Sequence, residues 1–358
     1  MKVLFATGGS GGHIFPALQT ALELKKRGHD ISFAGVLDMA QIRIVSEGFI
    51  CHNTGAKGFS GRSLLGIIRF CFFMAMALIR SMAVLRRVRP DKVVGFGGYG
   101  SFSVVLAGKI LGHPVMILEQ NVIPGKANRI LAKLADKTAI GFKSSSKYFD
   151  PVKTVWTGCP CHDRPVKRTC EQICADLGLR PKGRIIVLLG GSQGSGFLNK
   201  IFFEAMGILA GQQDVQAVHM TGKNEYALYV EKYKKAGLPV IVSSFIAEME
   251  ELYTVADLVI ARCGAATVAE LGAFAVPSVL VPYPFAEGHQ KYNGRILEEA
   301  GAALLIEQKD IDTHVLLKAI ETLSGPEFTR ERIRQKTEGL FIKNAEKHLA
   351  DAVEALWV

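Results

Sequence analysis

The sequence lacks the features that identify several large protein classes. No helix-turn-helix, RNP or zinc-finger pattern occurs in its 358 residues, and few aromatic residues lie among the basic ones. Domains that bind nucleic acid usually carry one of these patterns, so we expect no nucleic-acid partner. A DxD-type metal motif is also missing, and we expect neither a metal nor any other cofactor.

Cysteine is too sparse and too irregular for a disulfide framework. The seven cysteines have no regular spacing, and the first apolar run stops at Gly8, too early for a signal peptide. We therefore expect the chain to work in a reducing cytoplasm. One group has ligand types that zinc accepts: Cys159, Cys161, His162, Cys170 and Cys174. Its CxC and CxxxC spacings are unusual for zinc, which favours free structural thiols.

Basic residues are concentrated in the first half of the chain. Residues 1–157 hold 21 Lys and Arg against 8 Asp and Glu, whereas residues 158–358 hold 22 against 25. A strongly basic half is typical of contact with nucleic acid, anionic lipid or phosphorylated substrates. Without a nucleic-acid motif, an anionic membrane surface and phosphorylated substrates remain as expected partners.

Short β-branched runs alternate with helix-length segments, which predicts an α/β fold with doubly wound parallel sheets. The expected strands include 31–34, 92–96, 115–118, 185–189, 240–242, 258–261 and 278–281. The length favours two domains. Both 2–18 and 184–200 have a strand, a Gly-Gly-Ser loop and a helix start, as two Rossmann-like halves would.

Prolines between 155 and 168 interrupt this alternation and indicate a domain boundary there. We predict a first domain over 1–160 and a second over 161–340. A last helix within 341–358 is expected to pack back on the first domain.

The stretch ATGGSGGHIFPAL, at 6–18, predicts a phosphate-binding turn at a helix start. Free backbone N–H groups at such a turn attract anions. Walker A would need a lysine here, and the dinucleotide motif GxGxxG would need glycine in place of Ile14. Two more glycine turns follow strands, at 95–103 and 190–199. Each turn taken singly is compatible with a simple tight turn, but three in one chain favour a diphosphate-bearing ligand.

The segment 262–293 contains small residues and then polar ones. Gly264 is followed by Ala265 and Ala266, so a ligand could approach the backbone. We expect Thr267 to cap a helix that carries Glu270 in its first turn, where a carboxylate can hold a ribose diol. The alternative is an ordinary surface glutamate. Further along lie His289, Gln290 and Asn293, whose polar side chains suit sugar hydroxyls.

The segment 64–90 is the most apolar part of the basic half. Arg69 and Arg80 enclose ten uncharged residues. A spanning helix needs about 20 apolar residues, so we do not expect this segment to cross a membrane. It is either a buried crossover helix or a helix on the membrane surface, and the basic charge favours the surface.

Taken in order, these motifs resemble the MurG family, the membrane-associated N-acetylglucosaminyltransferases of peptidoglycan synthesis. The resemblance extends over nearly the whole chain. The matching stretches are GGSGGH (8–13), GGY (97–99), EQN (119–121), GGSQG (190–194), FI (245–246), RCGAATVAE (262–270) and the 290–293 segment.

The resemblance implies the GT-B fold, in which two Rossmann-like domains face a cleft. It implies inverting transfer of GlcNAc from UDP-GlcNAc to the C4 hydroxyl of MurNAc-pentapeptide on undecaprenyl diphosphate, which converts lipid I to lipid II in cell-wall biogenesis. It also implies a peripheral protein on the cytoplasmic face of the bacterial plasma membrane. Two alternatives are another lipid acceptor, such as diacylglycerol, and a catalytically silent scaffold that binds a nucleotide sugar.

The resemblance also assigns site residues. Ile246 reads uracil, Glu270 holds ribose, and the basic domain takes the acceptor, with Gly97, Gly98 and Tyr99 at its diphosphate. The full donor set is Ser10, Gly11, Gly12, Asn121, Ser192, Ile246, Ala265, Ala266, Thr267, Val268, Ala269, Glu270 and Gln290. The first glycine loop is expected to lie close to the acceptor diphosphate as well.

A base must remove the proton of the acceptor hydroxyl, and His13 is the first candidate because imidazole titrates near neutral pH. The alternative role for His13 is to order its loop or to bind the acceptor diphosphate. Glu119 is the second candidate base, with a structural carboxylate as its alternative.

The chain departs from the family pattern at a few positions. Leu118 stands where the family has His before Glu-Gln-Asn, and Gly-Cys-Pro-Cys-His at 158–162 replaces Gly-Asn-Pro-x-Arg. His162 therefore occupies the place of an arginine that contacts the donor, and Arg164 is a possible substitute. After Gly-Gly-Tyr the chain reads Gly-Ser-Phe where Val-Ser-Gly is commoner. The role of Asn293 is left open.

Overall fold

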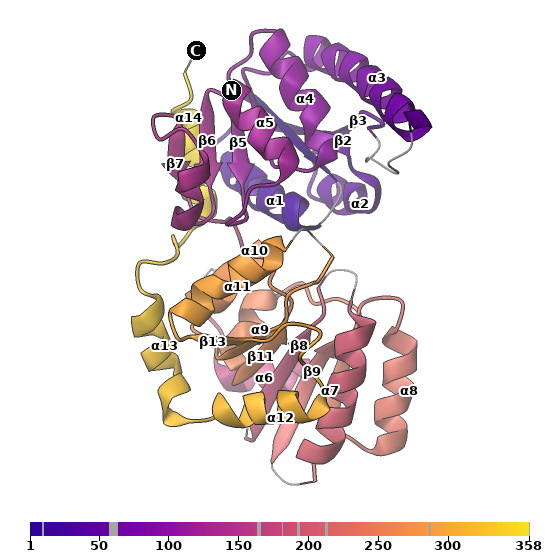
Figure 1. Cartoon of the computed structure of the whole chain (residues 1–358), viewed down its shortest axis with the longest axis vertical. Helices are drawn as coiled ribbons and strands as arrows, with labels where there is room; N and C mark the ends of the chain where they lie inside the picture. Colours follow the sequence, from indigo (N-terminus) through magenta and orange to yellow (C-terminus); the bar gives the residue numbers. More distant parts are fainter. Residues whose placement is uncertain are drawn as a thin grey trace. The chain divides into compact units, whose positions relative to one another are not determined.

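The computed structural model describes residues 1–8, 11–56, 64–162, 166–180, 182–191, 194–211, 214–285 and 288–357. The chain divides into two compact units (Figure 1). Unit 1 contains residues 1–161 and 342–358, and unit 2 contains residues 162–341. The chain thus enters unit 2 once and returns to unit 1 for its last helix.

Unit 1 is built on a parallel sheet with the strand order β3-β2-β1-β4-β5-β6-β7. The strands are β1 (Lys2–Gly8), β2 (Asp30–Val36), β3 (Ile50–Asn53), β4 (Lys92–Gly95), β5 (Val115–Glu119), β6 (Lys137–Ile140) and β7 (Thr154–Trp156). The helices are α1 (Gly11–Lys26), α2 (Asp38–Ser46), α3 (Leu64–Val88), α4 (Tyr99–Ile110), α5 (Lys126–Leu134) and α14 (Ala345–Glu354), with a 3-10 helix at Lys143–Tyr148.

Unit 2 is built on a second parallel sheet with the order β10-β9-β8-β11-β12-β13. The strands are β8 (Arg184–Leu189), β9 (Val215–Met220), β10 (Val240–Ser243), β11 (Leu258–Ala261), β12 (Ser278–Leu280) and β13 (Ala303–Leu305). The helices are α6 (Cys170–Leu177), α7 (Gly196–Leu209), α8 (Tyr226–Ala236), α9 (Met249–Val255), α10 (Ala265–Phe274), α11 (His289–Glu299), α12 (Thr313–Thr322) and α13 (Arg330–Thr337), with a 3-10 helix at Pro326–Phe328.

These sheets confirm the predicted α/β class with two Rossmann-like halves. The central strand β8 is apolar and buried from Ile185 to Leu189, because helices cover both faces of a parallel sheet. Each unit has a strand order in which the direction of winding reverses beside its first strand, β1 or β8. Loops at the carboxyl ends of the strands next to that reversal form the usual ligand site of such sheets.

Helix α14 completes the core of unit 1. Leu349, Ala350 and Val353 are fully buried and belong to the same apolar cluster as Phe5 of β1 and Leu18 of α1. In Figure 1 the yellow C-terminal helix lies beside the strands of this unit. At the helix end, Lys92 Nζ donates to the carbonyls of residues 353 and 354 at 2.9 and 2.7 Å.

Helix α3 extends well beyond the ten uncharged residues between Arg69 and Arg80. It has 25 residues, and its part from 68 to 88 is long and apolar enough to cross a membrane by length and composition. The expectation that the segment is too short to span is therefore wrong. One face of α3 nevertheless packs in unit 1, where Ala77, Ser81 and Leu85 are buried. The opposite side exposes Ile68, Phe72 and Ile79.

All seven cysteines are free thiols. Cys159, Cys161 and Cys174 are buried, whereas Cys170 is exposed. Within the part of the chain that the structure describes, no three side chains of His, Cys, Asp or Glu come close enough to hold a metal ion.

Candidate active site

In unit 1, the predicted site residues follow the neighbouring strands β1, β4 and β5. Parallel strands that are adjacent in a sheet end at the same edge, so the three loops lie close together. His13 is the third residue of α1, which follows β1. Gly97 and Gly98 follow β4 with φ of 88° and 76°, a region that L side chains avoid. A Cβ on Gly97 would lie 3.1 Å from His13 Nδ1.

The absence of side chains at these glycines makes room for the imidazole of His13. The ring is half-buried, and its Nδ1 is covered and makes no hydrogen bond of normal geometry to the described residues. Two other covered atoms of this region, Gln120 Oε1 and Asn128 Oδ1, share this property. Burial lowers the pKa of His13, and the negative charge of Glu119 partly opposes this effect.

Glu119 is buried at the end of β5, with 1% of its surface exposed. Its Oε1 accepts from the backbone N–H of Asn121 at 2.9 Å and from Asn121 Nδ2 at 3.1 Å. Its Oε2 accepts from Gly125 N–H at 3.0 Å and from Asn128 Nδ2 at 2.9 Å. Four N–H donors therefore hold this carboxylate, which orders the loop between β5 and α5.

The other unit 1 candidates occupy helix starts and this loop. Gly11 and Gly12 are the first two residues of α1, and Tyr99 is the first residue of α4. Asn121 is engaged with Glu119. Ser10 lies outside the described residues, as do Ser192 and Arg164 of the second half of the chain.

In unit 2, the segment after β11 differs from the expectation in two details. The N-cap of α10 is Gly264, so the prediction that Thr267 caps this helix is wrong. Glu270 is the sixth residue of α10 and therefore lies in the second turn, not the first. Gly264 has the extended backbone that is typical of an N-cap, with φ of −62° and ψ of 147°. The residues from Ala265 to Ala269 form the first turn and the start of the second.

Glu270 is not a surface glutamate, because only 6% of it is exposed. Tyr253 Oη donates a hydrogen bond of 2.8 Å to Glu270 Oε2, and the backbone N–H of His162 donates one of 3.1 Å to Oε1. Burial raises the pKa of Glu270, and the neighbouring His162 opposes this. The imidazole of His162 itself contacts Glu250, with 3.0 Å between Nδ1 and Oε2.

Gln290, at the start of α11, joins two loops of unit 2. Its Oε1 accepts from the backbone N–H of Cys263 at 3.2 Å and from that of Tyr283 at 2.9 Å. These two bonds fix the orientation of the side-chain amide. Asn293 is fully buried and donates from Nδ2 to the Cys263 carbonyl at 3.2 Å. Ile246 lies half-exposed between β10 and α9.

Sequence reasoning missed three side chains that organise these loops. Asn128 binds Glu119, Tyr253 binds Glu270, and Arg262 joins the loops after β8 and β11 through Ser195 Oγ at 2.8 Å. Arg262 lies two residues before Gly264, and this position at the end of β11 was the signal that could have identified it. Asn128 and Tyr253 lie in ordinary helical segments, where nothing in the pattern marks them.

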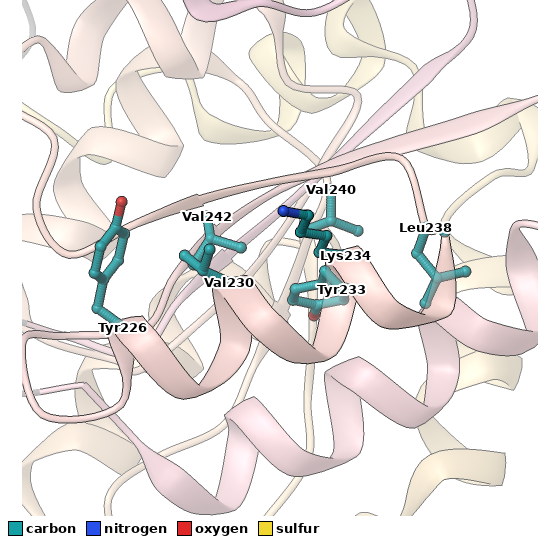
Figure 2. Close-up of a pocket in the computed structure, with 8 residues that line it drawn as sticks. Tyr226, Val230, Tyr233, Lys234, Leu238, Val240 and Val242 are labelled. Atoms are coloured by element: carbon teal, nitrogen blue, oxygen red, sulfur yellow. The ribbon is translucent and has the colours of Figure 1, made fainter.

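A cavity of about 360 Å³ lies elsewhere in unit 2, between α8 and β10 (Figure 2). Val230, Leu238, Val240 and Val242 form much of its wall. The hydroxyl of Tyr233 makes a hydrogen bond of 2.9 Å with His219 Nδ1. None of the predicted site residues lines this cavity, so it is not part of the candidate active site.

Comparison with known proteins covers both halves of the chain. Residues 3–140 match the glycosyltransferase family 28 N-terminal domain, and residues 185–352 match the C-terminal domain of the same family. The chain is 36% identical over 334 residues to the UDP-N-acetylglucosamine–N-acetylmuramyl-(pentapeptide) pyrophosphoryl-undecaprenol N-acetylglucosamine transferase of Halothermothrix orenii, which covers 90% of each chain. It is 33% identical to the enzyme of the same name from Shewanella baltica, over 98% of this chain and 96% of that one.

Solved structures agree with these relatives. The crystal structure of MurG from Acinetobacter baumannii covers 99% of both chains with a TM-score of 0.77 and 27% identity. The calicheamicin glycosyltransferase CalG4 shares the fold, with a TM-score of 0.72 at 17% identity. Both halves of the chain, in the expected order, thus match one family, and the chain belongs to glycosyltransferase family 28, within its MurG group of N-acetylglucosaminyltransferases.

Proposed function

We propose that this chain transfers GlcNAc from UDP-GlcNAc to the C4 hydroxyl of lipid-linked MurNAc-pentapeptide, with inversion at the anomeric carbon. The observation that carries the proposal is the match to transferases of this name at 33 to 36% identity over at least nine-tenths of the chain. The reaction makes a cell-wall precursor, and so contributes to cell shape and division.

Unit 2 binds the donor in this proposal. Glu270 accepts hydrogen bonds from the ribose diol, and the backbone at Ile246 reads uracil. The N–H groups at the start of α10, from Ala265 to Thr267, face the diphosphate, where the positive end of the helix dipole stabilises the charge of the leaving UDP. The N–H of Val268 does not take part, because it donates to the Gly264 carbonyl at 2.9 Å. Gln290 is already oriented by its Oε1, which supports a role for Nε2 as a donor to the sugar.

Residue 162 contributes to the donor side through its backbone. Its N–H reaches Glu270, whereas its side chain reaches Glu250. This contact with Glu270 does not depend on which side chain the residue carries. Histidine in the place of the family's arginine is therefore compatible with an active enzyme.

Unit 1 takes the acceptor, with the glycine loops after β1 and β4 at its diphosphate. His13 is the base in this proposal. Its lowered pKa keeps the imidazole neutral at pH 7, as a proton acceptor must be. Glu119 is less suited to that role because both of its oxygens already accept hydrogen bonds, from four N–H donors in all. Its charge instead stabilises the imidazolium that forms when His13 takes the proton.

Contact with the cytoplasmic face of the plasma membrane completes the proposal. The lipid tail of the acceptor requires the enzyme to work at a membrane surface. The exposed apolar face of α3 and the excess of basic residues in unit 1 support this location.

The test is transfer of labelled GlcNAc from UDP-GlcNAc to a short-chain lipid I analogue in EDTA. We expect turnover by the wild type and roughly a 10²- to 10⁴-fold lower rate for His13→Ala, with UDP binding retained. The pH profile of the wild-type kcat/KM should have its acid limb below pH 6.5, because the buried imidazole stays neutral until the pH falls to its lowered pKa.

Diacylglycerol serves as the competing acceptor. Turnover with diacylglycerol in place of the lipid I analogue would contradict the proposed acceptor. UDP binding without any transfer would indicate a silent scaffold.

A further inference from the structure

We propose that Tyr253 is a positioning residue that sets the recognition of the donor ribose by Glu270. The inference rests on the proposed function, in which Glu270 binds the ribose diol. Tyr253 lies on α9 and reaches Glu270 across the interface of α9 and α10.

The tyrosine is held rigidly in this place. It is fully buried, and its ring packs on Phe274 with 5.6 Å between the ring centroids. Its backbone carbonyl accepts a hydrogen bond of 2.7 Å from Arg330 Nη2. The hydroxyl therefore has little freedom, and its bond of 2.8 Å fixes Glu270 Oε2.

The other oxygen of the carboxylate is fixed from a different part of the chain. His162 N–H donates to Oε1 at 3.1 Å, so among the described residues each oxygen has one donor, and the plane of the carboxylate is set at both ends. Each carboxylate oxygen can accept a second hydrogen bond. The two remaining acceptor sites suit a pair of adjacent hydroxyls, which is what a ribose offers.

Tyr253 also favours the ionised form of Glu270. Burial opposes ionisation, and a hydrogen bond donated to the charged form counteracts burial. An ionised carboxylate accepts on both oxygens, whereas a protonated one has lost an acceptor site to its own proton. Among the described residues, Tyr253 is the one side chain that donates a hydrogen bond to Glu270.

The test compares the binding of UDP and of 2′-deoxy-UDP by calorimetry, at pH 7, to wild type and to Tyr253→Phe. The substitution removes one buried oxygen. We expect roughly a 10-fold loss of UDP affinity, the order expected when a hydrogen bond to a charged group is removed. The affinity for 2′-deoxy-UDP should change less, so the preference for UDP should fall. With the lipid I analogue, KM for UDP-GlcNAc should rise while kcat stays within about twofold.

Tyr229→Phe is the matched control. Tyr229 is another buried tyrosine of unit 2, on α8, and it makes no contact with Glu270 among those described. The Tyr229→Phe protein should prefer UDP over 2′-deoxy-UDP to the same extent as the wild type. A Tyr253→Phe protein with the wild-type preference would overturn the inference.

Glu270→Gln separates this inference from the proposed function. If Glu270→Gln retains the full preference for UDP, the ribose role of Glu270 is wrong. If Glu270→Gln loses the preference and Tyr253→Phe retains it, only the role of Tyr253 is wrong. Should Tyr253→Phe fail to fold, 3-fluorotyrosine in place of Tyr253 changes the acidity of the donor, and an unchanged preference for UDP would then contradict the inference.

Discussion

His13 lies in a space that exists because two neighbouring positions have no side chain. Gly97 and Gly98 adopt positive φ, and a Cβ at either would lie within 3.2 Å of the imidazole. Glycine is thus needed at these two positions for two reasons. It adopts the positive φ of the loop, and its lack of a side chain leaves space for the imidazole ring. The same loop geometry places the ring beside the charge of Glu119.

We expect Gly97→Ala to lower the transfer rate roughly 10- to 100-fold, because the new methyl group displaces the imidazole from its position. Steady-state kinetics with the lipid I analogue measures this effect. UDP binding should not change, because the residues proposed to bind the uracil and the ribose, Ile246 and Glu270, lie in unit 2.

Gly112→Ala is a suitable control for the backbone effect. Gly112 has φ of 79°, close to the 88° of Gly97, but nothing lies within 4 Å of its Cβ position. Both variants carry the strain of an L residue at positive φ, on the order of 1–2 kcal/mol. Equal activity of the two variants would show that the clearance for His13 is not needed.

At the scale of the element, α3 has two different faces. Ala77, Ser81 and Leu85 pack in unit 1, so the helix is a part of that fold. Phe72 and Ile79 are 61% and 60% exposed, and arginines at 69 and 80 lie beside them in the chain. Apolar side chains next to cations suit the interface of an anionic membrane.

We expect the double substitution Phe72→Ser, Ile79→Ser to weaken binding to anionic phospholipid vesicles by roughly 10-fold or more, since two large apolar side chains no longer enter the lipid. Vesicle co-sedimentation measures this. Ile208→Ser is the control, because Ile208 is 44% exposed on α7 of unit 2. If the double variant binds the vesicles as tightly as Ile208→Ser does, the proposed contact of α3 with the membrane is wrong.

At the scale of the whole molecule, the chain ends in the unit where it began. Helix α14 supplies Leu349 and Val353 to the core of unit 1, and Leu356, two residues after the helix, joins the same core. Arg27, the residue directly after α1, also forms ion pairs with Asp351 at 2.6 Å and Glu354 at 2.9 Å, which join the end of the first helix to the last helix of the unit.

We expect a chain that ends at Phe341 to lose the fold of unit 1 and to keep that of unit 2. Each buried Leu or Val contributes roughly 1.5–3 kcal/mol, and the total for α14 approaches the stability of a typical domain. UDP binding should persist while a thermal unfolding transition is lost. A chain that ends at Leu356 is the control, since it keeps α14 and removes Trp357, which is 82% exposed. If the shortened chain loses UDP binding as well as the fold of unit 1, the prediction that unit 2 folds without unit 1 is wrong.

The amino-acid sequence by itself determined the two parallel sheets, most of their strands and the strand ends near which His13, Gly97, Glu119 and Glu270 lie. These follow from local patterns, because β-branched runs and glycine turns act over a few neighbouring residues. The charge difference between the halves and the resemblance to a family are likewise properties of the chain as written.

Only the tertiary structure decided how these side chains are held. Thr267 was a plausible cap from its type, but the turn after β11 places Gly264 there instead. The donors to Glu119 and Glu270 come from positions up to 108 residues away in the chain, such as His162 N–H. Burial and hydrogen bonding depend on which distant segments meet, and no local pattern encodes that. For the same reason, the sequence did not show which side of α3 is buried and which is exposed. That difference arises from the packing of the helix in unit 1.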